Sequence, residues 1–148
     1  MAGRLQDKVA LITGAGSVAE GWGNGKATAV LFAREGAKIF GVDVNQDAAE
    51  ETCRIIKEEG GTCLAHTADV TDSATVRKMI EACIAAYGRI DILHNNVGGS
   101  VPGGPVEMAE EDWDANIDLN LKSVFLTCKE ALPIMEAQGG GAIVNVAS

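Results

Sequence analysis

The sequence predicts an α/β fold, a doubly wound parallel sheet with helices on both faces. Two observations predict it: short apolar runs recur along the 148 residues, and segments with helical periodicity lie between them. Strands that alternate with helices form parallel sheets, and right-handed crossovers between them wind the chain in both directions. The sequence shows no linker, repeat or low-complexity segment. We therefore expect one domain over residues 1–148.

The first half of the pattern predicts two strands and two helices. Residues 8–13 (KVALIT) form an apolar run that ends at a glycine, which indicates a strand. Residues 25–35 carry apolar side chains at helical spacing and predict the first helix. Residues 38–43 (KIFGVD) predict a second buried strand, and residues 47–59 predict a charged helix that ends at a pair of glycines.

The next part of the chain repeats this alternation. Residues 62–66 predict a third strand. Asp72 can accept hydrogen bonds from the first free amides of a helix, so we expect a helix that begins there and ends at Tyr87. Residues 90–93 predict the fourth strand.

The last part contains a loop, a long helical region and a fifth strand. Residues 98–105 are rich in glycine and proline, which is typical of a loop. Residues 110–137 predict a helical region, broken near Ala115 and bent at Pro133. Residues 142–147 (AIVNVA) predict the fifth strand.

The charge balance excludes some classes of partner. Twelve basic residues against 21 acidic ones give a net charge of −9, which disfavours a nucleic acid or an anionic membrane surface as partner. No apolar run approaches the roughly 20 residues of a membrane span, and the first residues carry no apolar signal region. We expect a soluble cytoplasmic protein.

The four cysteines show no pattern of a metal site or a redox couple. Cys53, Cys63, Cys83 and Cys128 include no C-x-x-C pair and no histidine at ligand spacing. We therefore expect no metal, and we expect the cysteines to be reduced, partly buried structural residues.

Glycines cluster between the first predicted strand and the first predicted helix. A dinucleotide pyrophosphate needs glycines here, because side chains would block the backbone, while the helix N-terminus supplies amide donors and a favourable dipole. The cofactor-binding residues expected in this loop are Gly14, Ser17, Gly23, Asn24 and Gly25.

Asp43 ends the second predicted strand, 18 residues after Gly25. This is close to the roughly 20 residues expected for a carboxylate that binds the adenosine ribose. Such a carboxylate would accept from the ribose hydroxyls and repel a 2′-phosphate, so we expect NAD as cofactor rather than NADP. The alternative is that the glycines only form turns and that Asp43 is a solvated strand end.

These motifs resemble the short-chain dehydrogenase/reductase family, whose first loop usually reads T-G-x-x-x-G-x-G. The match has an insertion of about five residues around positions 18–22, and Gly23 and Gly25 take the place of the later glycines. Four further stretches resemble the family: Asp69-Val70, Asn95-Asn96-Val97-Gly98, the segment from Asp118 that carries Asn120, and the final strand that ends at Ser148.

The resemblance implies a Rossmann fold and a role for each matching residue. Asp69 and Val70 would contact the adenine, and Asn95, Val97 and Gly98 would stabilise the central sheet and line the adenine ribose. The resemblance also implies two catalytic residues: Ser148, which would position the substrate, and Asn120, which would support a proton relay.

Each of these residues also has a purely structural interpretation. Asp69 could cap a turn, the asparagines of the Asn-Asn pair could hold loop backbone, and Asn120 could bond a neighbouring carbonyl. We expect the two histidines to be structural or solvated, and Tyr87, which has no lysine four residues later, to serve packing.

The family's proton donor is a tyrosine in a Y-x-x-x-K motif on the helix after the serine strand, and this sequence ends at Ser148. The family's last strands and helices are also missing. We therefore expect the tyrosine and lysine in sequence beyond residue 148, and we expect the 148 residues alone to bind cofactor without turnover.

The sequence thus predicts an NAD-dependent oxidoreductase that acts on a small secondary alcohol or its ketone. By analogy with the family, we expect a homo-oligomer that uses the helical region 112–137. The first alternative is a non-catalytic NAD-binding module that acts with a partner chain. The second is a nucleotide-sugar epimerase, against which the Asn-Asn-Val-Gly stretch and the short spans between elements argue.

Overall fold

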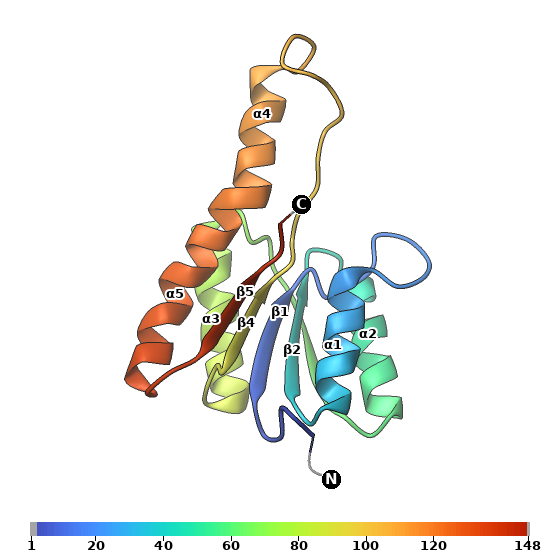
Figure 1. Ribbon diagram of the computed structural model, residues 1–148, viewed down its shortest axis with the longest axis vertical. Coiled ribbons are helices and arrows are strands. Elements are labelled where there is room, and N and C mark those ends of the chain that lie inside the picture. The colour runs from blue at the N-terminus through green and yellow to red at the C-terminus, as the bar shows by residue number, and fades with distance from the viewer. Residues whose placement is uncertain (1–2, 148) are drawn as a thin grey trace.

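The computed structural model describes residues 3–147 and contains one parallel sheet flanked by helices (Figure 1). The strands are β1 (Val9–Thr13), β2 (Lys38–Asp43), β3 (Thr62–Thr67), β4 (Ile92–Asn95) and β5 (Ala142–Asn145). The helices are α1 (Asn24–Arg34), α2 (Gln46–Glu58), α3 (Ser73–Tyr87), α4 (Glu110–Ile117) and α5 (Ser123–Ala137), with a π-helical turn η1 (Asp118–Lys122) between the last two.

The strand order β3-β2-β1-β4-β5 confirms the doubly wound prediction. All four strand pairs are parallel, with Leu11 of β1 opposite Phe40 of β2 on one side and Leu93 of β4 on the other. From β1, the chain adds β2 and then β3 on one side. It then crosses over and adds β4 and β5 on the other side of β1. In such sheets the crevice beyond the carboxyl ends of β1 and β4 is the usual ligand site.

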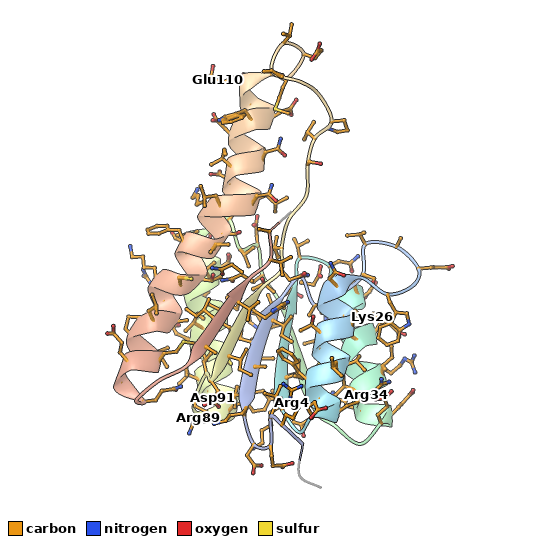
Figure 2. The ribbon with its side chains drawn as sticks, viewed as in Figure 1. Arg4, Lys26, Arg34, Arg89, Asp91 and Glu110 are labelled. Carbon is orange, nitrogen blue, oxygen red and sulfur yellow. A yellow bond between two sulfur atoms is a disulfide. The ribbon has the colours of Figure 1, made fainter. Side chains whose placement is uncertain are left out.

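At the opposite end of the strands, Asp91 links the amino ends of β1 and β4. Its Oδ2 accepts the Val9 backbone N–H at 2.9 Å, and Arg89 Nη2 donates to its Oδ1 at 2.6 Å (Figure 2). Burial raises the pKa of this carboxyl, but these donors more than offset that effect and hold its pKa below the ordinary value. β4 begins at Ile92, two residues later than predicted.

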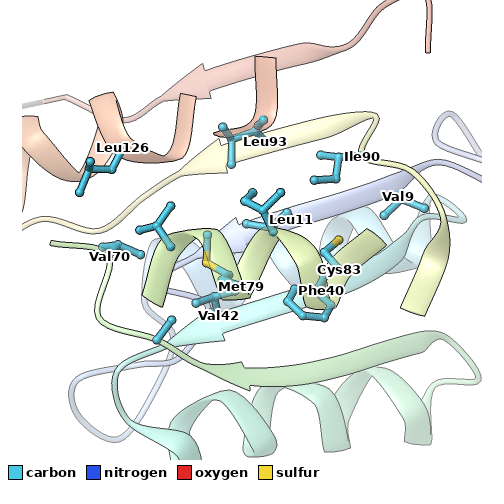
Figure 3. Packing of buried hydrophobic residues seen from close by; sticks show 14 of the residues in the cluster. Val9, Leu11, Phe40, Val42, Val70, Met79, Cys83, Ile90, Leu93 and Leu126 are labelled. Atoms are coloured by element: carbon cyan, nitrogen blue, oxygen red, sulfur yellow. The ribbon is translucent and has the colours of Figure 1, made fainter. Parts of the chain in front are cut away.

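Two apolar cores lie on opposite faces of the sheet, because successive side chains of a strand alternate between faces. Leu11, Val42, Met79 and Leu93 belong to the core under α3 and α5 (Figure 3). Ile12 belongs to the core under α1 and α2. Each fully buried side chain of this size contributes about 1.5–3 kcal/mol, so both cores hold the strand ends rigidly in place.

Side-chain caps fix where the central helices begin. Asp72 Oδ1 accepts the backbone N–H of Thr75 at 2.8 Å, as predicted for α3. Asn45 Oδ1 accepts that of Ala48 at 3.2 Å and starts α2 immediately after β2. Gly88 ends α3 with φ 77°, a left-handed conformation that glycine adopts without strain.

The predicted break of the last helical region near Ala115 is wrong. The helix runs through Ala115 and widens instead at η1, while Pro133 lies inside α5. Asn120 explains the wide turn: its Nδ2 donates to the Asn116 carbonyl at 2.9 Å, the acceptor that a backbone amide would use in a regular α-helix.

The prediction that all cysteines are reduced is also wrong. Cys53 of α2 and Cys63 of β3 form a disulfide, with their Cα atoms 5.1 Å apart. The tight turn after α2 lays β3 back against the helix, which brings residues ten positions apart into bonding distance. Cys83 and Cys128 are free, as predicted.

Within residues 3–147, no helix has the length and apolar character needed to cross a membrane. Over the same residues, no three side chains of histidine, cysteine, aspartate or glutamate gather in a way that could hold a metal ion.

Candidate cofactor groove

A groove of about 750 Å³ opens at the carboxyl ends of β1, β2 and β4. This is within the usual size range of ligand sites. All but one of the residues predicted to bind the cofactor line it: Gly14, Ser17, Gly23, Asn24, Gly25, Asp43, Asp69, Val70, Val97 and Gly98. The structure thus brings together residues that are far apart in the sequence.

The glycines of the loop are required by geometry. Gly14 has φ 63°, which a side chain would strain. A Cβ on Gly25 would overlap the carbonyl oxygen of Gly14, so the start of α1 packs directly on the end of β1. A Cβ on Gly16 would lie 2.5 Å from the Cβ of Ala48. The loop therefore fits closely between α1 and α2 only with glycine at these positions.

The inserted residues form a loop that Ser17 closes at its base. Ser17 Oγ accepts the Gly23 backbone N–H at 2.8 Å and donates to the Gly21 carbonyl at 3.1 Å. The Lys26 ammonium lies 5.1 Å from the centre of the exposed Trp22 ring, which holds the far side of the loop against α1. Val18 is fully exposed and lines the groove.

Asp43 lies at the end of β2, with its carboxylate against the loop. Oδ2 accepts the Gly16 backbone N–H at 2.9 Å, and Oδ1 accepts that of Asn45 at 2.9 Å. A carboxylate has about four acceptor sites, so each oxygen can still accept from a ligand hydroxyl.

Asp69 and Val70 form the next wall of the groove. Thr71 donates to Asp69 Oδ1 through its hydroxyl at 2.6 Å and its backbone N–H at 2.9 Å. These bonds, the hydroxyl first, lower the pKa of Asp69 and keep it a carboxylate. Val70 is buried beside it.

The exception among the predicted residues is Asn95. Its Oδ1 accepts from Thr127 Oγ1 at 2.7 Å and its Nδ2 donates to Asn145 Oδ1 at 2.9 Å, so the side chain joins β4, α5 and β5 below the groove. Asn96 lines the groove instead and donates from Nδ2 to the Gly14 carbonyl at 3.1 Å.

Asn120 also has a structural role in this arrangement. Its Nδ2 donates to the Gly99 carbonyl at 2.7 Å, and its Oδ1 accepts the Gly99 backbone N–H at 3.1 Å. The side chain thus clamps the loop after β4 to η1. Ser148 lies outside the described residues, but β5, which leads toward it, ends beside Asn95 at the same edge of the sheet.

Tyr87 and the two histidines, which were expected to serve packing or to be structural or solvated, do not line the groove. Tyr87 Oη donates to the Ile39 carbonyl at 3.1 Å, and burial raises the pKa of Tyr87 to about 12. His66 packs against the Phe40 ring, with ring centroids 5.4 Å apart. His94 is buried, and its two ring nitrogens have no hydrogen-bond partner among residues 3–147.

Thr52, which the sequence did not single out, supports the glycine-rich loop. Thr52 of α2 donates from Oγ1 to the Ala15 carbonyl at 2.8 Å, inside the glycine-rich loop. Nothing in its local sequence indicates this role, because the contact joins residues 37 positions apart.

Comparison with known proteins identifies the fold family. The short chain dehydrogenase family matches residues 8–148. The chain belongs to this family. A crystal structure of a short-chain dehydrogenase/reductase from Burkholderia xenovorans is 52% identical, with a TM-score of 0.97 over 99% of this chain and 58% of the other.

Named relatives of the chain are oxidoreductases. The 3-oxoacyl acyl-carrier-protein reductase FabG of Thermotoga maritima is 41% identical over 98% of this chain and 57% of its own length. The D-threitol dehydrogenase of Mycolicibacterium smegmatis is 40% identical over 98% and 54%. A 7α-hydroxysteroid dehydrogenase in complex with NADH and 7-oxo glycochenodeoxycholic acid has a TM-score of 0.91 at 36% identity, over 98% of this chain and 55% of the other. The chain spans about half the length of the curated relatives it matches.

Proposed function

We propose that residues 1–148 are the NAD-binding domain of an oxidoreductase that transfers hydride between NAD(H) and a secondary alcohol or its ketone. The observation that carries the proposal is the groove, in which the glycine-rich loop, the Asp43 carboxylate and the Asp69–Val70 wall face one another. The relatives named above, two dehydrogenases of alcohols among them, support the reaction class.

The residues present fit a dinucleotide. The N-terminus of α1 has no acidic residue and no side-chain cap, so the amides of Asn24 and Gly25 are free to face a pyrophosphate. The carboxylate of Asp43 would accept from the adenosine ribose hydroxyls. Val70 offers an apolar contact to the adenine, and Asp69 keeps its second oxygen as an acceptor for the adenine amino group.

The preference for NAD over NADP rests on Asp43. A 2′-phosphate at about 4 Å from the carboxylate would be repelled by about 1 kcal/mol in water and by about 4 kcal/mol near a protein surface, for each pair of unit charges. The amides of Gly16 and Asn45 hold the carboxylate in position, so it cannot turn away without losing two hydrogen bonds.

The bound cofactor would supply or accept the hydride. In this chain, Asn120 would keep the Gly98–Gly99 backbone in place as one wall of the reaction site, and Ser148 would position the substrate oxygen. Proton transfer to that oxygen needs an acid or base tuned near the working pH. Tyr87 is the one tyrosine of the sequence, and it donates to a backbone carbonyl away from the groove.

We also propose that the α4–α5 helix is a homo-oligomer interface. Trp113, Ile117, Leu121 and Phe125 recur every four residues and are all exposed. A line of large exposed apolar side chains along one helix is typical of an interface. The helix extends well beyond the sheet, so this surface is open to a second copy (Figure 1).

The alternative function is a non-catalytic NAD-binding module that acts with a partner chain. The observation in its favour is that no tyrosine or cysteine lines the groove formed by the described residues. Both hypotheses require cofactor binding. They differ for a chain that also carries a tyrosine and a lysine at the groove: the oxidoreductase hypothesis predicts that this chain catalyses hydride transfer, and the module hypothesis predicts that it does not.

An assay with two proteins separates them. The 148-residue chain is expected to bind NADH but not to reduce NAD⁺ with secondary alcohols. A chimera that adds the C-terminal half of the 52%-identical Burkholderia xenovorans protein is expected to reduce NAD⁺. Binding without turnover by a folded chimera would favour the module.

A further inference from the structure

The glycine-rich loop is held from below by α2. Thr52 Oγ1 donates to the Ala15 carbonyl at 2.8 Å, and both residues are completely buried. On its other side, the Ala15 backbone N–H donates to the Val42 carbonyl at 2.9 Å. A buried carbonyl without a donor costs about 1–3 kcal/mol, so the position of Thr52 helps to determine the path of the loop.

The next residue along α2 is covalently anchored. Cys53 forms the disulfide with Cys63 of β3, and both residues are buried. A Cβ placed on Gly41 would lie 3.8 and 3.9 Å from the two sulfurs and 3.4 Å from the Cβ of Ala15. At Gly41, the β2 backbone therefore packs against both the disulfide and the loop residue Ala15.

Opening the disulfide would disturb this packing. A dithiol reductant attacks one sulfur, the S–S bond breaks, and the two cysteines take up two electrons and two protons as the reductant forms its own disulfide. The sulfurs then move from a bond of about 2.05 Å to a contact of roughly 3.5–4 Å. Protein cores hold few voids that could absorb this change.

The movement would be passed to the loop through α2. Ala48 and Thr52 lie one turn apart on this helix, and they contact Gly16 and Ala15 respectively. A shift of α2 away from β3 therefore changes the support of the two loop residues next to Asp43, which itself bonds the Gly16 amide.

We propose that Thr52 is a positioning residue for the cofactor loop, and that the Cys53–Cys63 disulfide anchors it, so that reducing the disulfide weakens dinucleotide binding. This inference rests on the proposed function, because the ligand measured is NADH. It adds a dependence of dinucleotide affinity on the redox state of the disulfide, which neither the groove nor the family match implies.

The disulfide is buried, but one of its cysteines lies next to a surface hollow. Cys53 lines a shallow hollow between α2 and β3, together with Arg54, Leu64 and Ala65. The two free cysteines belong to, or pack against, the core on the other face of the sheet. They serve as internal controls for the effect of a thiol reagent.

The first test compares NADH affinity before and after treatment with dithiothreitol, with alkylation and mass measurement to count free thiols. We expect two alkylated cysteines in unfolded untreated protein and four after reduction, with the dissociation constant raised about tenfold. Cys63→Ser is expected to bind like the reduced protein and to ignore the reductant. Cys128→Ser is expected to respond like the wild type.

The second test separates positioning from folding. Thr52→Ser keeps the hydroxyl and is expected to keep the affinity for NADH. Thr52→Val is expected to bind about tenfold more weakly while remaining folded by circular dichroism. Equal affinity of the valine and serine variants would overturn the role of Thr52.

Equal affinity of the oxidised and reduced wild type, or four alkylated cysteines in the untreated protein, would overturn the role of the disulfide and leave the proposed function intact. Failure of the oxidised wild type to bind NADH would contradict the proposed function, and this inference with it.

Discussion

Asp43 Oδ2 accepts the backbone N–H of Gly16 at 2.9 Å, which joins the end of β2 to the loop that follows β1. We predict that Asp43→Asn weakens NADH binding about tenfold. We also predict a smaller ratio between the affinities for NADH and NADPH, because the charge that repels a 2′-phosphate is lost. Titration of NADH and NADPH by fluorescence measures both effects. Asp47→Asn, an exposed change in the first turn of α2, is the matched control. An unchanged ratio of the two affinities in Asp43→Asn would show that the carboxylate does not select the cofactor.

Asn95 is expected to act on stability rather than on cofactor binding. Asn95→Ala removes two side-chain hydrogen bonds made by a buried residue, to Thr127 and Asn145, so we predict a loss of about 1–3 kcal/mol in the free energy of unfolding. Urea unfolding measures this loss. NADH affinity at low temperature is expected to change less than about threefold, and a larger loss of affinity with unchanged stability would place Asn95 in the site.

Asn95 and its neighbour Asn96 differ in a way that the local sequence does not reveal. Apolar periodicity predicted the strands and the sheet type. The glycine-rich loop, the acid at the end of β2 and the resemblance to the family together predicted a set of cofactor-binding residues, all of which except Asn95 line the groove. These patterns could not tell which of two adjacent asparagines faces the ligand, because β4 ends at Asn95 and only there does the chain leave the sheet. Thr52 and the Cys53–Cys63 bond depend on how α2 packs, and the η1 turn depends on the side chain of Asn120. None of these follows from local pattern.

His94 should make the protein less stable in mild acid. Burial lowers the pKa of His94 below its ordinary value of about 6.5, so the unfolded chain takes up a proton first as the pH falls through that value. The stability of the wild type is therefore expected to fall below about pH 6.5. His94→Leu is expected to be more stable by about 1 kcal/mol, with a larger gain in acid, because two unpaired ring nitrogens are removed.

Urea unfolding at about pH 7.5 and pH 5.5 tests this prediction for wild type and variant. Burial also lowers the pKa of His66, which is retained in both proteins, so only the difference between them reports on His94. A variant whose stability falls with acid as steeply as that of the wild type would contradict the assignment.

The exposed apolar line on α4–α5 is expected to be covered by a second copy. Phe125→Glu places a charge at one end of this line, so we predict that this variant is a monomer while the wild type is an oligomer by sedimentation. Val106→Glu changes an even more exposed apolar side chain in the loop before α4 and is expected to leave the oligomer intact. A monomeric wild type would rule out this interface.

Equilibrium titration of the wild-type protein with NADH and with NADPH under the same conditions tests most directly whether the groove is an NAD site. The geometry of the glycine-rich loop and the carboxylate of Asp43 predict that NADH binds and that NADPH binds at least about tenfold more weakly. Binding of neither nucleotide, or tighter binding of NADPH, would contradict the proposal that this groove is an NAD site.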